Sequence, residues 1–418
     1  MKAPLLVLAM AACTHDIDVF DRVEVQNARD LDILFVFDDS PDRNTYDQMA
    51  SQLDVLQGRL QDVDGQLPNL HVGVTTTDLG TKGTMDLIPE PQQGNCVGTG
   101  NGGALVKFAA NVDGDFLEDL RGEAGARVRN YASGDLLSEL GKLTNPGTGA
   151  ARTGCEFEQP LEAMRRALDP GINPGFIRRN AQLAIVFMTN EDDCSFSTGK
   201  LLDPNDGTLG ALDSFRCTKQ GVICDGDDIS ATGEKTNCRP RDGSPFMVDV
   251  SEYQTFLQGY KDDPSDVIVS AVVGAPAPFA VQDFGSPVLG ASCQGVGGSA
   301  KPAVRIGALV DSMGGVMVDG CAQTDGYQKI TAPIVSSQRS CLPNLRRADG
   351  EDCRVIEKQV DGTSTELARC ADGAPSPCWL TIEDATACPS GDNLGVAIAR
   401  GDTTVPVGSK IEATCFVK

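Results

Sequence analysis

The sequence predicts an α/β protein: a three-layer, Rossmann-like domain with a mainly parallel sheet and helices on both faces, followed by a small disulfide-rich β module. Three observations predict this architecture. Nearly continuous apolar runs, typical of strands buried on both faces, alternate with amphipathic helical stretches. Acidic loops follow two of these runs, where ligands bind in such sheets. Beyond about residue 345 the chain becomes dense in cysteine and in turn residues.

The first predicted strand covers residues 31–37, and an amphipathic helix with apolar residues three or four apart follows between 46 and 63. The other strands of this domain are predicted at 71–77, 183–189, 267–274 and 316–318. The other helices are predicted at 156–168, 253–260, 303–311 and 326–339. In the C-terminal module, strands are predicted at 394–398 and 410–415.

These elements divide the 418 residues into segments. A chain of this length exceeds the usual size of one hydrophobic core, so a large domain with a smaller one is expected. The predicted segments are a signal peptide at 1–12, a tether at 13–29, the α/β domain at 30–345 with a polar insertion at 195–247, and the cysteine-rich module at 346–418.

The N-terminus has the pattern of an export signal, with Lys2 before a short apolar run. Cys13 directly follows Ala11 and Ala12, which is typical of the cysteine that is acylated in bacterial lipoproteins. We therefore expect an exported protein, anchored through lipid on Cys13 to the cell envelope, at the outer membrane. The alternative is cleavage after Ala11, which would give a soluble periplasmic or secreted protein.

The cysteine count agrees with export. The chain has fifteen cysteines, and fourteen remain when Cys13 is set aside. Fourteen thiols can close as seven disulfides, which persist in an oxidising compartment.

Charge and histidine content exclude several functions. A formal net charge of −24 argues against nucleic acid as a partner. The chain has two histidines, and because His15 lies beside the expected processing site, a Ser/His/Asp triad or a His-ligated zinc site would have to be built from His71 alone. We therefore expect a protein that is not an enzyme; hydrolysis by paired carboxylates stays open as the least favoured alternative.

The stretch from Asp38 through Ser40 to Asp42 follows a buried strand and precedes an amphipathic helix. It resembles the first loop of a von Willebrand factor A domain, Asp-x-Ser-x-Ser, with Asp42 in place of the last serine. The resemblance implies a site for Mg²⁺ or Ca²⁺, cations that prefer hard oxygen ligands. It also implies that a carboxylate of a partner protein completes the coordination.

Two later loops extend the resemblance. Residues 153–155 look like the second loop, with Cys155 at the position of the family's threonine. Residues 189–194 look like the third loop, with Asn190 where the family has aspartate. The residues expected around the cation are Asp38, Ser40, Asp42, Thr153, Asn190 and Asp192.

A wider resemblance links residues 30–345 and the cysteine-rich part to exported von Willebrand A proteins of myxobacteria and their relatives, often lipoproteins. It rests on the stretch from Gly154 to Ala163, on Glu-Asp-Asp-Cys-Ser at 191–195, and on Asp263-Pro264 before the strand at 267–274. It implies binding of an unidentified protein or surface ligand rather than catalysis. A metal-free structural or assembly subunit is the alternative.

We also predict a disulfide between Cys155 and Cys194. Both are expected on loops at the same edge of the sheet, one before a helix and one after a strand. Such a bridge would join the two loops beside the cation site.

Overall fold

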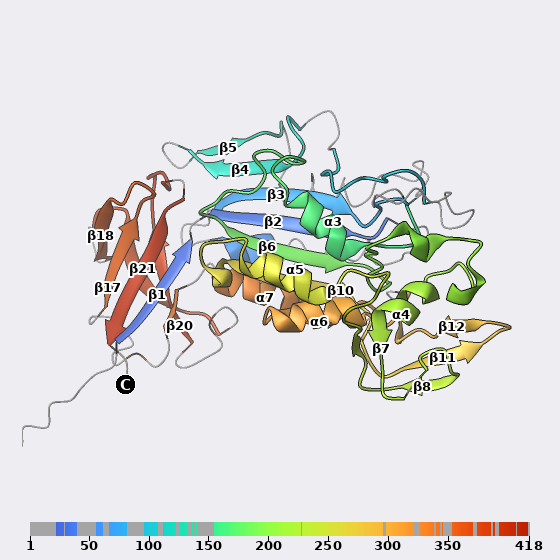
Figure 1. Ribbon diagram of the computed structural model, residues 1–418. Helices are drawn as coiled ribbons and strands as arrows, with labels where there is room; N and C mark the ends of the chain where they lie inside the picture. Colours follow the sequence, from blue (N-terminus) through green and yellow to red (C-terminus); the bar gives the residue numbers. More distant parts are fainter. Residues whose placement is uncertain are drawn as a thin grey trace, which may run out of the picture.

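The structure is a computed structural model (Figure 1). It describes residues 22–28, 30–39, 56–61, 67–81, 96–107, 112–122, 126–132, 136, 139, 154–226, 228–295, 298–321, 327–337, 340–342, 345, 353–370, 374–385, 388, 393–406 and 408–416. No helix within these residues is both long enough and apolar enough to cross a membrane.

The α/β domain is built on a seven-stranded sheet with the order β15-β10-β6-β2-β3-β4-β5. Five neighbouring strands are parallel, and β4 and β5 extend the sheet in antiparallel pairing. Their bounds are β2 (Asp30–Phe37), β3 (Asn69–Thr76), β4 (Leu117–Arg121), β5 (Arg127–Arg129), β6 (Gln182–Met188), β10 (Val267–Val273) and β15 (Val316–Asp319). The predicted mainly parallel sheet is thus confirmed.

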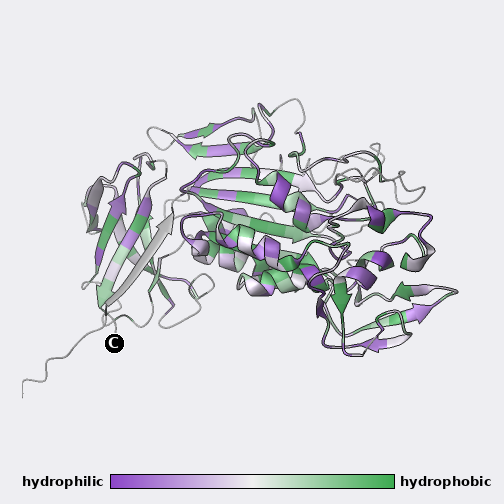
Figure 2. Ribbon diagram, in the orientation of Figure 1, coloured by the Kyte–Doolittle hydropathy of each residue, from purple (hydrophilic) through white to green (hydrophobic). Residues whose placement is uncertain are grey.

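Helices cover both faces of this sheet. One face packs against α3 (Pro160–Ala167), α5 (Val250–Gln258) and α6 (Val304–Ser312) in one hydrophobic core. The other face packs against α7 (Tyr327–Ser337) and the helical residues 56–60 in a second core. Strands β2 and β6 are buried along their whole length and are mainly apolar, as Figure 2 shows; Asp30 and Asp32, at the start of β2, are buried polar residues.

The β module has its own core around Trp379 and its own seven-stranded sheet, ordered β1-β21-β17-β18-β19-β20-β16. The strands are β1 (Arg22–Ala28), β16 (Ser340–Leu342), β17 (Arg354–Lys358), β18 (Ser364–Arg369), β19 (Cys378–Glu383), β20 (Leu394–Ala399) and β21 (Lys410–Phe416). The predicted strands at 394–398 and 410–415 are present. Strand β1 was not predicted, because its residues were expected to belong to the tether.

The insertion after β6 carries α4 (Phe215–Gly221), β7 (Val222–Ile223), β8 (Gly233–Lys235) and β9 (Arg239–Pro240). A second insertion, missed in the sequence, follows β10 and holds β11 (Phe279–Asp283), β12 (Pro287–Leu289), β13 (Cys293–Gly295) and β14 (Gly298–Ala300). Strand β8 pairs with β11, so the two insertions form one subdomain beside the sheet (Figure 1).

Seven disulfides pair all fourteen cysteines after Cys13, as the count predicted. The predicted pair Cys155–Cys194 is wrong. Cys155 bonds to Cys96 of the glycine-rich loop, and Cys194 bonds to Cys217 of the first insertion. The spacing of cysteines along a chain does not determine which of them pair. Here Cys155 and Cys194 each bond to a cysteine of a different segment and not to each other.

Candidate functional site

The loops that follow β2, β3 and β6 meet at the carboxyl edge of the sheet. Backbone hydrogen bonds continue the strand pairing into these loops, from Asp38 N–H to the carbonyl of Met188 at 3.0 Å and from Thr77 N–H to the carbonyl of Phe37 at 2.8 Å. The N–H of Gln159 donates to the carbonyl of Thr77 at 3.0 Å. The start of α3 is thereby held against the same edge.

Asp38 lies at the centre of this edge and is fully buried. Its Oδ2 accepts hydrogen bonds from Thr189 Oγ1 at 3.3 Å and from the backbone N–H of Asn190 at 3.4 Å. The structure therefore brings Asp38 and Asn190 together, as the family resemblance implies. The other predicted ligands of the first two loops, Ser40, Asp42 and Thr153, lie outside the described residues.

Gly154 allows the second loop to lie in close contact with Asp39. Its N–H donates to the Asp39 carbonyl at 3.2 Å, and a Cβ added at Gly154 would lie 2.4 Å from that carbonyl oxygen. Only glycine permits this approach. The adjacent Cys155 is bonded to Cys96, so this loop is fixed on both sides.

Several carboxyl groups crowd this edge and raise one another's pKa. Burial, with the charges of Asp78 and Asp38, raises the pKa of Asp39 to about 7. Burial, with the charges of Glu191 and Asp38, raises the pKa of Glu158 well above its ordinary value, and burial raises that of Glu191 to about 7. Several negative charges close together in a poorly solvated place repel one another, and this raises the free energy of the folded protein. A cation bound among them would offset this repulsion.

Three oxygens at this edge are buried without a hydrogen-bond partner: Asp39 Oδ1, Thr77 Oγ1 and Asn190 Oδ1. Buried polar atoms in native proteins nearly always have partners, so three together need an explanation. Carboxylate, hydroxyl and amide oxygens are the ligands that Mg²⁺ and Ca²⁺ prefer. The residues present therefore fit a hard divalent cation.

Asp192, the last predicted ligand, is used differently. Its carboxylate accepts hydrogen bonds from the backbone N–H groups of Val304, Arg305 and Ile306 at 2.9 to 3.1 Å, at the start of α6. This is the position of a helix N-terminal cap, where a negative charge is favourable. Asp192 thus anchors the third loop to α6 rather than facing Asp38.

Asp193 anchors the same loop to a second helix, and this role was not predicted. Its Oδ1 accepts from Leu161 N–H at 3.1 Å, at the start of α3, and its Oδ2 pairs with buried Arg305 at 3.0 Å. Ser195 Oγ accepts from Glu162 N–H at 3.0 Å. The Asp-Asp-x-Ser spacing was the available signal, because such residues commonly cap helices.

His71, the one histidine among the described residues, does not belong to the site. It lies near the start of β3, six residues before Thr77, which corresponds to about 20 Å along a strand. Its Nδ1 is 2.7 Å from the carbonyl oxygen of Phe176, and burial lowers its pKa to about 4. It is a neutral core residue.

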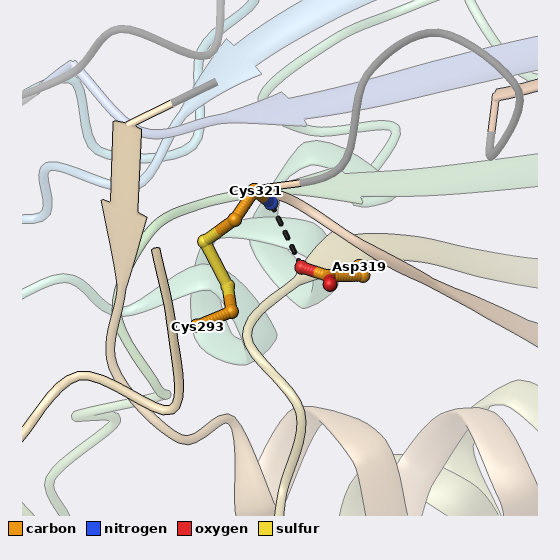
Figure 3. Close-up of side chains that lie close together, drawn as sticks. All are labelled: Cys293, Asp319 and Cys321. Carbon is orange, nitrogen blue, oxygen red and sulfur yellow. Dashed lines mark hydrogen bonds between the residues drawn. A yellow bond between two sulfur atoms is a disulfide. The ribbon is translucent and has the colours of Figure 1, made fainter. Parts of the chain in front are cut away.

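Cys293, Asp319 and Cys321 also bring three potential ligand atoms together, within 4.8 Å of one another (Figure 3). The two sulfurs are bonded to each other, so neither is a free thiolate. Asp319 Oδ1 accepts a hydrogen bond from the Cys321 N–H at 2.8 Å. This cluster closes the end of β15 onto β13 and is structural.

No known protein family matches the chain, and no curated protein is similar to it. Among solved structures, a von Willebrand factor type A protein from Catenulispora acidiphila is 10% identical with a TM-score of 0.30, over 96% of this chain and 66% of that one. A human COPII-coat protein is 10% identical with a TM-score of 0.33, over 97% of this chain and 48% of that one. The chain thus spans two thirds or less of either protein, and similarity at this level carries no argument about function.

Proposed function

We propose that the protein is a von Willebrand A-type binding protein of the cell envelope. In this proposal the carboxyl edge of the sheet holds a divalent cation, Mg²⁺ or Ca²⁺, and a partner protein or surface ligand binds there through a carboxylate. The protein binds rather than catalyses. The order of the main sheet and the position of Asp38 after β2 support the class.

The observation that carries the proposal is the combination of crowded carboxyl groups and unpartnered oxygens. Asp38 and Asn190 are hydrogen-bonded neighbours, and Asn190 Oδ1 and Asp39 Oδ1 are buried without partners. These residues would hold the cation, which when bound supplies positive charge for a ligand carboxylate. A bound cation would favour the ionised forms of Glu158 and Glu191, whose pKa values are raised in its absence.

The seven disulfides support export, because they persist where thiols are oxidised. Anchoring through lipid on Cys13 is part of the proposal and rests on the sequence. Replacement of Cys13 by serine should release the protein from membranes. Mass spectrometry that finds an unmodified N-terminus would contradict it.

Cation binding is tested by melting temperature. A ligand that binds only the folded protein stabilises it by about 2.7 kcal/mol at a hundred times its dissociation constant. Wild type should therefore melt at higher temperature in Mg²⁺ or Ca²⁺, and Asp38→Ala should lose this rise. Glu383→Ala, which removes an exposed carboxylate in β19 of the module, is the matched control and should keep it.

Asn190→Asp should bind the cation more tightly than wild type, because it adds a carboxylate beside Asp38. If calorimetry shows no heat with millimolar Mg²⁺, Ca²⁺ or Mn²⁺ for wild type or Asn190→Asp, the metal-free structural subunit takes the place of this proposal. A hydrolase is the least supported function, since the one described histidine is a buried residue far from the edge.

A further inference from the structure

We infer that the β module is the membrane-facing end of the protein and that the candidate site is presented at the opposite end. The inference rests on the anchoring part of the proposed function, and it concerns the orientation of the protein on a lipid surface. Three features of the structure carry it: where the chain enters the fold, which way β2 runs, and how the module is fixed.

The chain enters the fold through the module. Strand β1 pairs with β21 along its whole length, with Arg22 opposite Phe416 and Ala28 opposite Lys410. Both ends of the described chain therefore lie side by side in the module (Figure 1). The segment from Cys13 to Arg22 spans at most about 30 Å even when fully extended. A lipid on Cys13 therefore keeps this end of the module near the bilayer.

The chain then runs away from the module. A single residue separates β1 from β2, and β2 extends for eight residues, or about 26 Å, before it ends at the candidate site. The subdomain of the two insertions lies at the same far end as the site (Figure 1). The module thus acts as a spacer between the anchor and the binding edge.

The module is fixed to the α/β domain by buried polar contacts. Asp30 Oδ2 accepts from the N–H of Gly408 at 3.0 Å and pairs with Arg178 at 3.2 Å. Arg121 Nε donates to the carbonyl of Thr403 at 3.0 Å. Asp30 and Arg121 are buried, and moving the module would remove the hydrogen bonds that they make with Gly408 and Thr403, while Asp30 would keep its pairing with Arg178. A swinging module is therefore disfavoured.

Trp379, the only tryptophan, is a built-in probe of the module. The test places the full lipidated protein on phosphatidylethanolamine and phosphatidylglycerol vesicles that carry a dansyl lipid, and measures energy transfer from tryptophan. A double variant, Trp379→Phe with Phe284→Trp, places the single tryptophan donor at the exposed tip of the turn between β11 and β12, at the far end of the protein. Transfer should be several-fold stronger from Trp379 than from the tip.

The inference is overturned if energy transfer is equal from the two positions or stronger from the tip. It is also overturned if neither position shows transfer although the protein sediments with the vesicles. If Trp379→Phe fails to fold, Phe284→Trp alone, with both donors present, should show a lower mean transfer than wild type. If the lipidated protein does not sediment with vesicles, anchoring has failed. The same comparison with a histidine tag at position 13 on nickel-lipid vesicles then decides the orientation by itself.

Discussion

Asp193→Ala should be among the most destabilising single substitutions in the α/β domain. Asp193 is 1% exposed and its partner Arg305 is 0% exposed, so the substitution leaves a buried guanidinium without its carboxylate. It also removes the acceptor for the Leu161 N–H at the start of α3. Removing one partner of a buried ion pair costs about 3–5 kcal/mol, and the lost cap adds about 1 kcal/mol.

The assay is urea unfolding followed by far-ultraviolet circular dichroism, with disulfides intact. A loss of about 4–6 kcal/mol in the free energy of unfolding is expected. Trp379 fluorescence reports the module separately, so the α/β domain transition can be distinguished from that of the module. Asp192→Ala, which removes only a cap of α6, should cost about 1–2 kcal/mol and serves as the matched comparison.

A double-mutant cycle isolates the pair. Arg305→Met in the Asp193→Ala background removes the unpaired charge, so the double variant should recover part of the loss, with a coupling energy of about 2 kcal/mol. A loss below about 1 kcal/mol for Asp193→Ala, or a coupling near zero, would refute the reasoning. Either result would mean that water reaches Arg305 in the folded protein.

Three further outcomes are expected. Burial lowers the pKa of His71 to about 4, so the unfolded chain takes up the proton at a higher pH than the folded protein does. The free energy of unfolding should therefore fall by about 3 kcal/mol between about pH 6.5 and 4. Urea unfolding of wild type and His71→Leu at each pH tests this, because the variant should lack this loss. Gly154→Ala should weaken cation binding, since its Cβ would collide with Asp39; calorimetric affinity equal to wild type would contradict this. Peptide mapping of unreduced protein should recover Cys96 joined to Cys155, and any other partner for either cysteine contradicts the structure.

The central sheet was predictable because burial on both faces leaves a local signal. Strands β2, β6 and β10 are short, almost purely apolar runs, and each was located within one or two residues. Strand β1 gave no comparable signal. Its sequence, Arg-Val-Glu-Val-Gln-Asn-Ala, is largely polar, and its partner β21 lies at the other end of the chain. Pairing across such a separation cannot be inferred from a local pattern.

The site was predictable only in part. The position of Asp38 after a buried strand predicted that it lies at the carboxyl edge of the sheet, and the structure places it there, next to Asn190. Asp192 was misplaced because three unsatisfied N–H groups at the start of α6 compete for its carboxylate, and a sequence does not show which helix start lies nearby. Glu158 and Glu191 were missed because burial and mutual charge, rather than any motif, distinguish them.

The pairing of β1 with β21 has a consequence for biogenesis. Arg22 and Phe416 lie opposite each other, so the module cannot be completed until almost the whole chain up to Phe416 has been made. Closing a flexible loop of this length costs about 5 kcal/mol of chain entropy. An α/β domain that is already folded reduces this cost, because β1 directly precedes β2 and β16 directly follows α7, so both segments of the module are then attached to a folded body. We therefore expect the α/β domain to fold first and the module last. A chain that is truncated before β21 should leave the β1 segment accessible to proteases.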